Sequence, residues 1–132
     1  MITPDFPTFK TLATQGNLIP VVREVLADQD TPVSAYEKLR TALRAENPDA
    51  CTFLLESVEG GENIGRYSML GGMPRGILKA TGRTAEYTEN GSTQEFEDVD
   101  PLSVLQDLMS KYQPVPDDSL PRFTGGAVGF LG

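Results

Sequence analysis

Two segments of the chain carry apolar residues at helical spacing. In the first segment the apolar stripe consists of Val33, Tyr36, Leu39 and Leu43. Intervals of three and four residues place these side chains on one face of a predicted helix. Thr31 can cap this helix, and Pro32 suits the first helical position because no amide donor is required there. Ser34 followed by Glu37 offers an alternative capping box, and the helix is expected to end at Asn47-Pro48, because a residue before proline avoids helical geometry.

A second helix is predicted after Asp100-Pro101, which repeats the arrangement of cap and proline. Its predicted apolar face consists of Leu102, Leu105, Leu108, Met109 and Tyr112. Lys111 falls in the last turn, where a positive charge complements the helix dipole. Residues 113–121 hold three prolines and are predicted to be an extended linker. The first sixteen residues show no clear period and predict an irregular or short helical lead-in.

Runs of apolar and β-branched residues predict strands elsewhere. Residues 17–25 contain a proline, which cannot donate a ladder hydrogen bond, so an edge strand is expected. Residues 50–57 are typical of a strand buried on both faces, and Cys51 within them is expected to be a buried, inert thiol. Glycines in and near residues 64–73 predict a backbone that turns tightly or approaches another segment closely. Residues 122–132 predict the beginning of a core strand, within which the sequence stops.

A meander is predicted between the two helices, with strands over residues 76–81, 84–88 and 93–97. Asn90-Gly91 separates the last two, and this pair favours a type I′ turn because both central residues need positive φ. Tyr87 and Phe96 are expected to pair on the covered face. The elements together predict an α+β fold with a largely antiparallel sheet and packed helices.

Length and composition indicate one soluble domain. The chain has 132 residues, of which 39% are hydrophobic and 23% are charged, as in ordinary globular proteins. No apolar run approaches the roughly 18 residues of a membrane-spanning helix. The first ten residues lack the pattern of a secretory signal. We therefore expect a cytoplasmic protein that does not interact with membranes.

The charge and the missing histidine narrow the function further. The net charge is −8, and an acidic surface repels phosphate groups, so nucleic acid is not an expected partner. With no histidine in the chain, neither a Ser-His-Asp nor a Cys-His arrangement can form. The single cysteine excludes an internal disulfide and a cysteine-based zinc site. These residues alone are therefore a poor candidate for a complete active site.

One stretch of the chain carries a specific resemblance. Leu54-Leu55-Glu56-Ser57 at the end of the predicted strand is followed after a short loop by Gly65-Arg66-Tyr67-Ser68. This arrangement is similar to that of anthranilate synthase large subunits, which share their fold with aminodeoxychorismate synthases. The resemblance extends over the whole chain, through residues 17–21, 31–35 and 125–129. It implies that residues 1–132 are the amino-terminal regulatory portion of such a subunit, within a larger two-sheet sandwich.

In the family that the chain resembles, the Leu-Leu-Glu-Ser segment helps to form a feedback pocket for L-tryptophan. The resemblance implies that Glu56 pairs with the ligand's ammonium group through a charge-assisted hydrogen bond. Ser57 would contact the polar end of the ligand, and Leu55 would cover its ring. Arg66 matches a basic position near this pocket, and Pro32 matches a helix-start proline associated with it.

The resemblance also implies what a complete parent enzyme would do. It would convert chorismate and ammonia to anthranilate and pyruvate, with Mg²⁺ as cofactor and a glutamine amidotransferase subunit as the source of ammonia. The catalytic residues and metal ligands belong to the carboxy-terminal part of the family's chain. No catalytic or metal-binding residue is therefore assigned here, and the fragment alone is expected to be inactive.

Other interpretations of the same residues stay open. Glu56 and Ser57 can be solvated residues that leave the sheet, Arg66 can be a surface charge, and Gly125-Gly126 is better explained as a strand feature than as a phosphate cradle. An aminodeoxychorismate synthase is the nearest alternative enzyme. A stand-alone amino-acid-sensing module and a protein-binding scaffold are alternatives of another class.

Overall fold

The computed structural model describes residues 1–56, 67–121 and 123–132. Three helices and seven strands lie within this part of the chain, and the strand pairs β1–β2, β3–β4 and β6–β7 are antiparallel. The predicted α+β class is therefore confirmed. The chain divides into two compact units, which are described separately. Unit 1 comprises Met1–Leu26 and Ile77–Gly132, and unit 2 comprises Ala27–Gly76.

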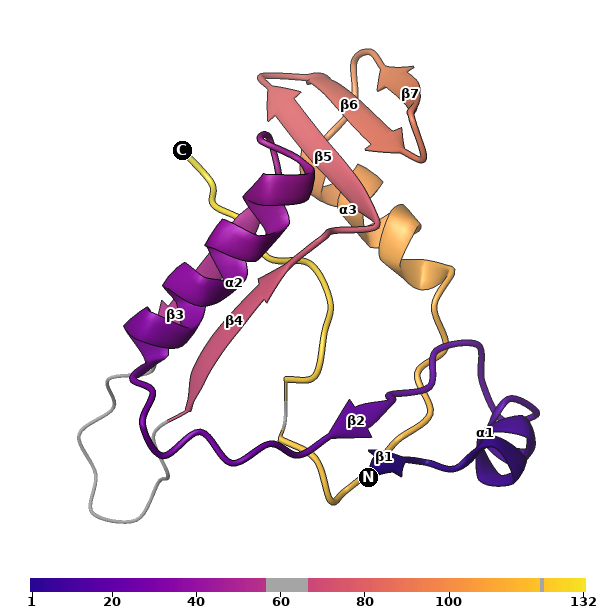
Figure 1. Cartoon of the computed structure of the whole chain (residues 1–132). Helices are drawn as coiled ribbons and strands as arrows, with labels where there is room; N and C mark the ends of the chain where they lie inside the picture. Colours follow the sequence, from indigo (N-terminus) through magenta and orange to yellow (C-terminus); the bar gives the residue numbers. More distant parts are fainter. Residues whose placement is uncertain (57–66, 122) are drawn as a thin grey trace, which may run out of the picture. The chain divides into compact units, whose positions relative to one another are not determined.

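Unit 2 is a helix packed on a hairpin. The helix α2 spans Pro32–Glu46, and the antiparallel strands β3 and β4 span Thr52–Glu56 and Ser68–Gly72 (Figure 1). The helix begins and ends where the sequence predicts, with Thr31 as its N-cap and Asn47 as its C-cap. The capping box is closed by the Ser34 side chain, so the alternative box between Ser34 and Glu37 is wrong. A hydroxyl at the third helical position already satisfies the cap amide.

Two adjacent glycines bring the hairpin and the helix close together. A Cβ atom on Gly72 would lie 2.4 Å from Leu43 Cδ1 of α2. A Cβ atom on Gly71 would lie 2.6 Å from the ring of Phe53 on the neighbouring strand. Both distances are shorter than a real Cβ contact, so a side chain at either position would require Leu43 or the Phe53 ring to move. The close backbone approach predicted for this glycine-rich segment is confirmed at its carboxyl end.

The prediction that residues 50–57 form a strand buried on both faces is wrong. The strand β3 exists, but its residues range from half-buried to exposed, and Cys51 is exposed. Within unit 2 the helix α2 covers one face of a two-stranded sheet, and a single helix cannot shield both faces. The expectation of a buried thiol fails for the same reason.

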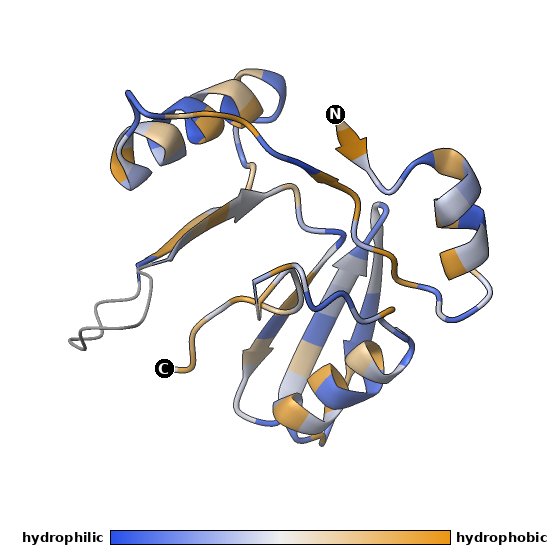
Figure 2. Ribbon diagram, turned by 90° about the horizontal axis from the view of Figure 1, so that it is seen from below, coloured by the Kyte–Doolittle hydropathy of each residue, from blue (hydrophilic) through white to orange (hydrophobic). Residues whose placement is uncertain are grey.

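Unit 1 contains a three-stranded sheet in the order β5-β6-β7, formed by Gly76–Thr81, Thr84–Glu89 and Ser92–Phe96. Along the central strand β6, buried or half-buried positions alternate with exposed ones, as in a sheet with one solvated face, and hydrophilic and hydrophobic residues both occur in the sheet (Figure 2). Asn90 and Gly91 both have positive φ, at 51° and 76°, which confirms the predicted turn.

The predicted pairing of Tyr87 with Phe96 is wrong. Phe96 lies opposite Ala85, and Tyr87 lies opposite Gln94. The two-residue turn places Glu89 opposite Ser92, and this register determines all the other residue pairs between β6 and β7. Tyr87 and Phe96 therefore share a face as diagonal neighbours.

The helix α3 spans Pro101–Ser110, with Asp100 as its N-cap as predicted. It packs on the sheet through buried Val104, while Ala85 of β6 is also buried. The predicted apolar face is correct only in part, because Leu102 and Met109 are exposed. Leu105 and Leu108, which follow Val104 by one and four residues, are half-buried. The face of α3 that packs on the sheet is therefore centred on Val104, which the predicted apolar face omitted.

Hydrogen bonds in unit 1 join the segment around Asn17 to the segment that follows α3. Asn17 Nδ2 donates to the carbonyl of Lys111 at 2.8 Å, and the Gln113 amide donates to Asn17 Oδ1 at 2.6 Å. The Asn17 amide also donates to the Gln113 carbonyl at 3.0 Å. Gly16 permits this approach, because a Cβ atom there would lie 2.4 Å from the same carbonyl oxygen. The extended segment after α3 is thereby held beside the start of the chain, as its prolines favour.

The first 25 residues of unit 1 form three short elements. The lead-in forms a two-residue strand β1, Ile2–Thr3, and a helix α1, Phe6–Leu12. The edge strand predicted over residues 17–25 is reduced to β2, Val22–Arg23, which pairs with β1. The proline in that segment limits the ladder.

The core strand predicted over residues 122–132 is wrong for the described residues 123–132, which form no strand. Phe130 and Leu131 are 95% and 83% exposed. A strand needs a neighbouring strand for its backbone groups, and none pairs with these described residues. The interpretation of Gly125-Gly126 as a strand feature fails with it. In the described part of the chain no helix is both long and apolar enough to cross a membrane.

We predict that Gly16→Ala destabilises unit 1 by about 1–3 kcal/mol, because the added methyl group forces the backbone away from Gln113. The measurement is urea unfolding of the variant and the parent chain. Gly129→Ala is the matched control, because a Cβ atom there meets nothing within 4 Å. Equal stability of the Gly16 variant and the parent would contradict the proposed close approach.

Candidate ligand-binding site

The candidate site residues lie at the end of the β3–β4 hairpin. Leu55 and Glu56 are the last two residues of β3, and their partners on β4 are Met69 and Ser68. Both predicted residues are exposed, with 46% of Leu55 accessible to solvent. Ser57 and Arg66, the other two predicted site residues, lie outside the described residues.

Contacts with α2 identify the two faces of the hairpin. Tyr36 Oη and Thr52 Oγ1 are hydrogen-bonded at 3.0 Å, and Leu43 packs over Gly72, the partner of Thr52. Thr52 and Gly72 therefore face the helix. Because side chains alternate along a strand, Leu54 and Glu56 lie on this helix face as well.

Leu55 lies on the opposite face, together with Phe53 and Met69. Phe53 is directed across Gly71 on this same face. The structure therefore does not place the Leu55 and Glu56 side chains on one surface, although sequence reasoning assigned both to one ligand. It brings Leu55 together with Met69, a residue that sequence reasoning missed. Strand alternation alone separates Leu55 from Glu56, whereas Met69 could be found only from the strand register.

The end of the hairpin offers two kinds of interaction. Phe53, Leu55 and Met69 form an apolar strip on the face opposite α2, in which Leu55 is exposed and the other two residues are half-buried. Glu56 ends the strand, and no described residue makes an ion pair or hydrogen bond with its carboxylate. The strip can contact an apolar group and the Glu56 carboxylate can contact a cation, but the two side chains leave the strand on opposite faces.

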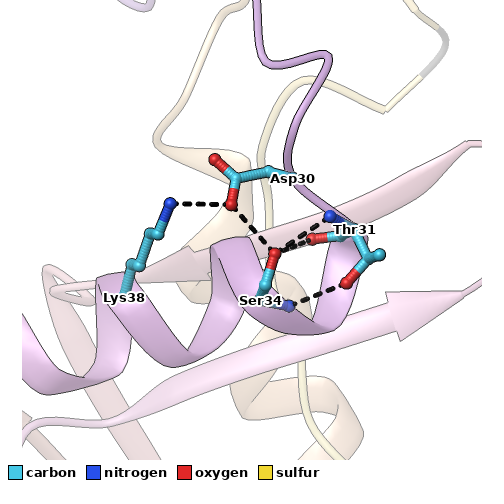
Figure 3. Close-up of polar contacts among 4 residues, drawn as sticks. All are labelled: Asp30, Thr31, Ser34 and Lys38. Atoms are coloured by element: carbon cyan, nitrogen blue, oxygen red, sulfur yellow. Dashed lines mark hydrogen bonds and ion pairs between the residues drawn. The ribbon is translucent and has the colours of Figure 1, made fainter.

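The start of α2 is held by a polar cluster of Asp30, Thr31, Ser34 and Lys38 (Figure 3). The Ser34 amide donates to Thr31 Oγ1 at 3.1 Å, and the Thr31 amide donates to Ser34 Oγ at 2.9 Å. Asp30 accepts from Ser34 Oγ at 2.9 Å and from Lys38 Nζ at 2.7 Å. Pro32 takes the first helical position inside this cluster, so it sets the helix start without a free donor.

The hydrogen bond from Lys38 lowers the pKa of the Asp30 carboxyl below its ordinary value of 3.8, and the Ser34 hydroxyl lowers the pKa further. Both donors favour the ionised carboxylate. The cluster therefore orders the end of α2 that is nearest in sequence to the linker between the units, while Tyr36 and Leu43 hold the hairpin.

A recess with a volume of about 290 Å³ lies in unit 1, between α3 and the edge strand β7. Its lining includes Phe96, Val104, Asp100, Asp107 and Lys111. Asp100 is committed to the helix cap, where it accepts from the Leu102 and Ser103 amides at 3.3 and 3.2 Å. This recess contains none of the ligand-binding residues that the sequence predicted, which are Leu55, Glu56, Ser57 and Arg66.

Comparison with known proteins identifies relatives over the whole chain. Anthranilate synthase component 1 of Synechocystis sp. is 44% identical over 133 aligned residues, which cover all of this chain and 25% of the relative. The protein of the same name from Neisseria meningitidis serogroup B is 44% identical over 94% of this chain and 24% of its own length. That from Acetivibrio thermocellus is 38% identical over all of this chain and 25% of its own length.

The chain thus spans about a quarter of the length of the curated relatives that it matches, and it aligns with their amino-terminal part. No family model matches the chain, and no solved structure matches it.

We predict that acid weakens the start of α2. A lowered pKa means that Asp30 contributes stability that is present above its unfolded pKa and lost as the pH falls through its lower folded value. An NMR titration should therefore place the Asp30 midpoint below 3.8, and Lys38→Gln should raise it. Lys79→Gln, a lysine on β5, is the control and should leave it unchanged. A midpoint at or above the ordinary value in the parent chain would contradict the cluster.

Proposed function

We propose that this chain is the regulatory portion of an anthranilate synthase. It belongs to the family of anthranilate synthase component 1 and corresponds to the amino-terminal part of those proteins. The complete parent converts chorismate and ammonia to anthranilate and pyruvate in tryptophan biosynthesis. The observation that carries this proposal is the 38–44% identity to relatives of that name over essentially the whole chain.

The parent enzyme needs parts that we assign outside this chain. Mg²⁺ would hold the substrate carboxylate, with its ligands in the remaining three quarters of the relatives' length. The designation component 1 supports a second subunit, which we propose to be a glutamine amidotransferase that supplies ammonia. Because its substrates are soluble metabolites, we place the enzyme in the cytoplasm.

Within this chain, we assign one wall of a feedback pocket for L-tryptophan to the end of the β3–β4 hairpin. Leu55 contacts the ring, and Glu56 pairs with the ammonium group. The two residues lie on opposite faces, but Glu56 is the last residue of β3 and its flexible side chain extends past the strand end. Ser57 and Arg66 are assigned to the polar end of the ligand from their positions in the sequence.

Feedback in the complete enzyme would work as a two-state switch. Tryptophan would bind between this wall and the carboxy-terminal part, and it would favour the less active arrangement by binding that arrangement more tightly. The separation of the wall from the chemistry, on different segments of the chain, supports inhibition at a distance over direct competition.

The first test uses the full-length parent with chorismate, Mg²⁺ and ammonium. We expect anthranilate fluorescence to appear and to be suppressed by L-tryptophan. An aminated chorismate that accumulates without anthranilate would instead assign the protein to the aminodeoxychorismate branch. Anthranilate formation that tryptophan does not affect would reject the feedback pocket while leaving the enzyme assignment intact.

The isolated chain should bind tryptophan weakly or not at all, because only one wall of the pocket is present and the ligand keeps much of its surface in water. The chain contains no tryptophan residue, so the fluorescence of added ligand can be titrated without protein background. The full-length parent is the positive control. A tight, saturable signal from the isolated chain would show that this wall suffices.

A further inference from the structure

We propose that the recess between α3 and β7 is a binding site for an apolar α-amino acid. The apolar part of its lining receives the side chain of the ligand, and two charged residues of α3 bind the ammonium and carboxylate groups. All the lining residues belong to unit 1, and the inference does not rest on the tryptophan pocket proposed above.

The size and the apolar lining of the recess suit a small ligand. Its volume of about 290 Å³ is close to the lower limit of the roughly 300–1,000 Å³ that is usual for small-molecule sites. Val104 in the lining is buried, whereas Phe96, Val99 and Leu108 are half-buried. A ligand can therefore cover apolar surface that the chain itself leaves partly exposed, which favours binding.

The helix α3 supplies one carboxylate and one ammonium group to the same recess. Asp107 follows Val104 by three residues and Lys111 follows Asp107 by four, so the three side chains lie along one side of the helix. Lys111 is the C-cap residue and keeps helical geometry, with φ −69° and ψ −19°. Its carbonyl accepts a hydrogen bond from Asn17 Nδ2 at 2.8 Å, which fixes the backbone from which the ammonium group extends.

These two charges are available to a ligand. No described residue makes an ion pair or a hydrogen bond with the Asp107 carboxylate or the Lys111 ammonium group. An exposed pair of these two residues, four apart on a helix, would contribute little, so a ligand can displace it at little cost. Asp100 in the same lining is different, because it accepts from two amides of the cap and from Ser103 Oγ at 2.8 Å.

Opposite charges beside an apolar surface select a zwitterion that has an apolar side chain. Asp107 accepts hydrogen bonds from the ammonium group of the ligand, and Lys111 donates to its carboxylate, in both cases as charge-assisted bonds. A carboxylic acid or an amine would use only one of the two charges. An amino acid with a polar side chain would leave the apolar lining uncovered.

The test measures the binding of L-leucine to the full-length parent by isothermal titration calorimetry. L-Tryptophan is present at a saturating concentration, so that the proposed feedback pocket is occupied. We expect saturable binding of L-leucine, and Asp107→Asn and Lys111→Gln should each weaken it at least about tenfold, a loss of about 1.4 kcal/mol.

Glu95→Gln is the matched control because it also removes one negative charge next to the recess. Glu95 lies between two lining residues of β7, Gln94 and Phe96, but its side chain is on the other face of the sheet and does not line the recess. This variant should change the affinity for L-leucine less than about twofold.

Two analogues of L-leucine separate recognition of the ligand from a structural role of the charges. The parent should bind 4-methylpentanoate, which lacks the amino group, and L-leucinamide, which lacks the carboxylate, at least about tenfold more weakly than L-leucine. Asp107→Asn should abolish the preference over 4-methylpentanoate, and Lys111→Gln should abolish the preference over L-leucinamide. Absence of L-leucine binding in the parent, unchanged affinity in both variants, or equal weakening of all three ligands would overturn the inference.

Discussion

The close approach of α2 to the β3–β4 hairpin decides how unit 2 is built. Gly72 has no side chain, so Leu43 can rest on the backbone, and Gly71 allows the ring of Phe53 to lie across the sheet on the other face. The two glycines are consecutive and therefore mark opposite faces of one strand. A shift of the register by a single residue would place Leu70 or Met73 under one of the two partners and would turn every side chain to the wrong face. The pair thus fixes which residues of β3 face the helix and which face outward.

Unit 1 depends on a similar device at a different place. Gly16 and Asn17 allow the start of the chain to lie against Gln113, nearly a hundred residues away in sequence. In both units a residue without a side chain is the point at which segments distant in sequence meet. Among the described residues the buried apolar side chains are Ala85, Val104 and Val115. Tight backbone contacts and helix caps therefore add to hydrophobic burial in organising the described part of the chain.

Local signals in the sequence were sufficient for the local structure. The caps at Thr31 and Asp100 and the turn at Asn90-Gly91 depend on a few neighbouring residues, and each is where it was predicted. Predictions about burial failed more often, as for Cys51, because burial depends on how many layers cover a strand. The face of α3 was also misplaced, since Val104 is buried where α3 packs on β6 and the packing partner of a helix is not given by its own spacing.

The candidate site shows the same limit. The family resemblance assigned Leu55 and Glu56, which are consecutive in the sequence, to one ligand. Consecutive residues of a strand point to opposite faces of the sheet. The pairing of Leu55 with Met69 follows only from the register of β3 and β4. Ser57 and Arg66 lie between these strands in the sequence and outside the described residues. The neighbours of Leu55 on β4 therefore could not be found from the Leu-Leu-Glu-Ser segment alone.

The construction of the wall also bears on how feedback could operate. The hairpin is fixed on α2 by Leu43 and Tyr36, and the start of α2 is fixed by Asp30 and Lys38. These contacts organise the wall within unit 2. In the proposed function the second wall lies in the rest of the parent chain. If tryptophan shifts the enzyme between two states, the difference in its affinity for those states can arise where the two walls meet.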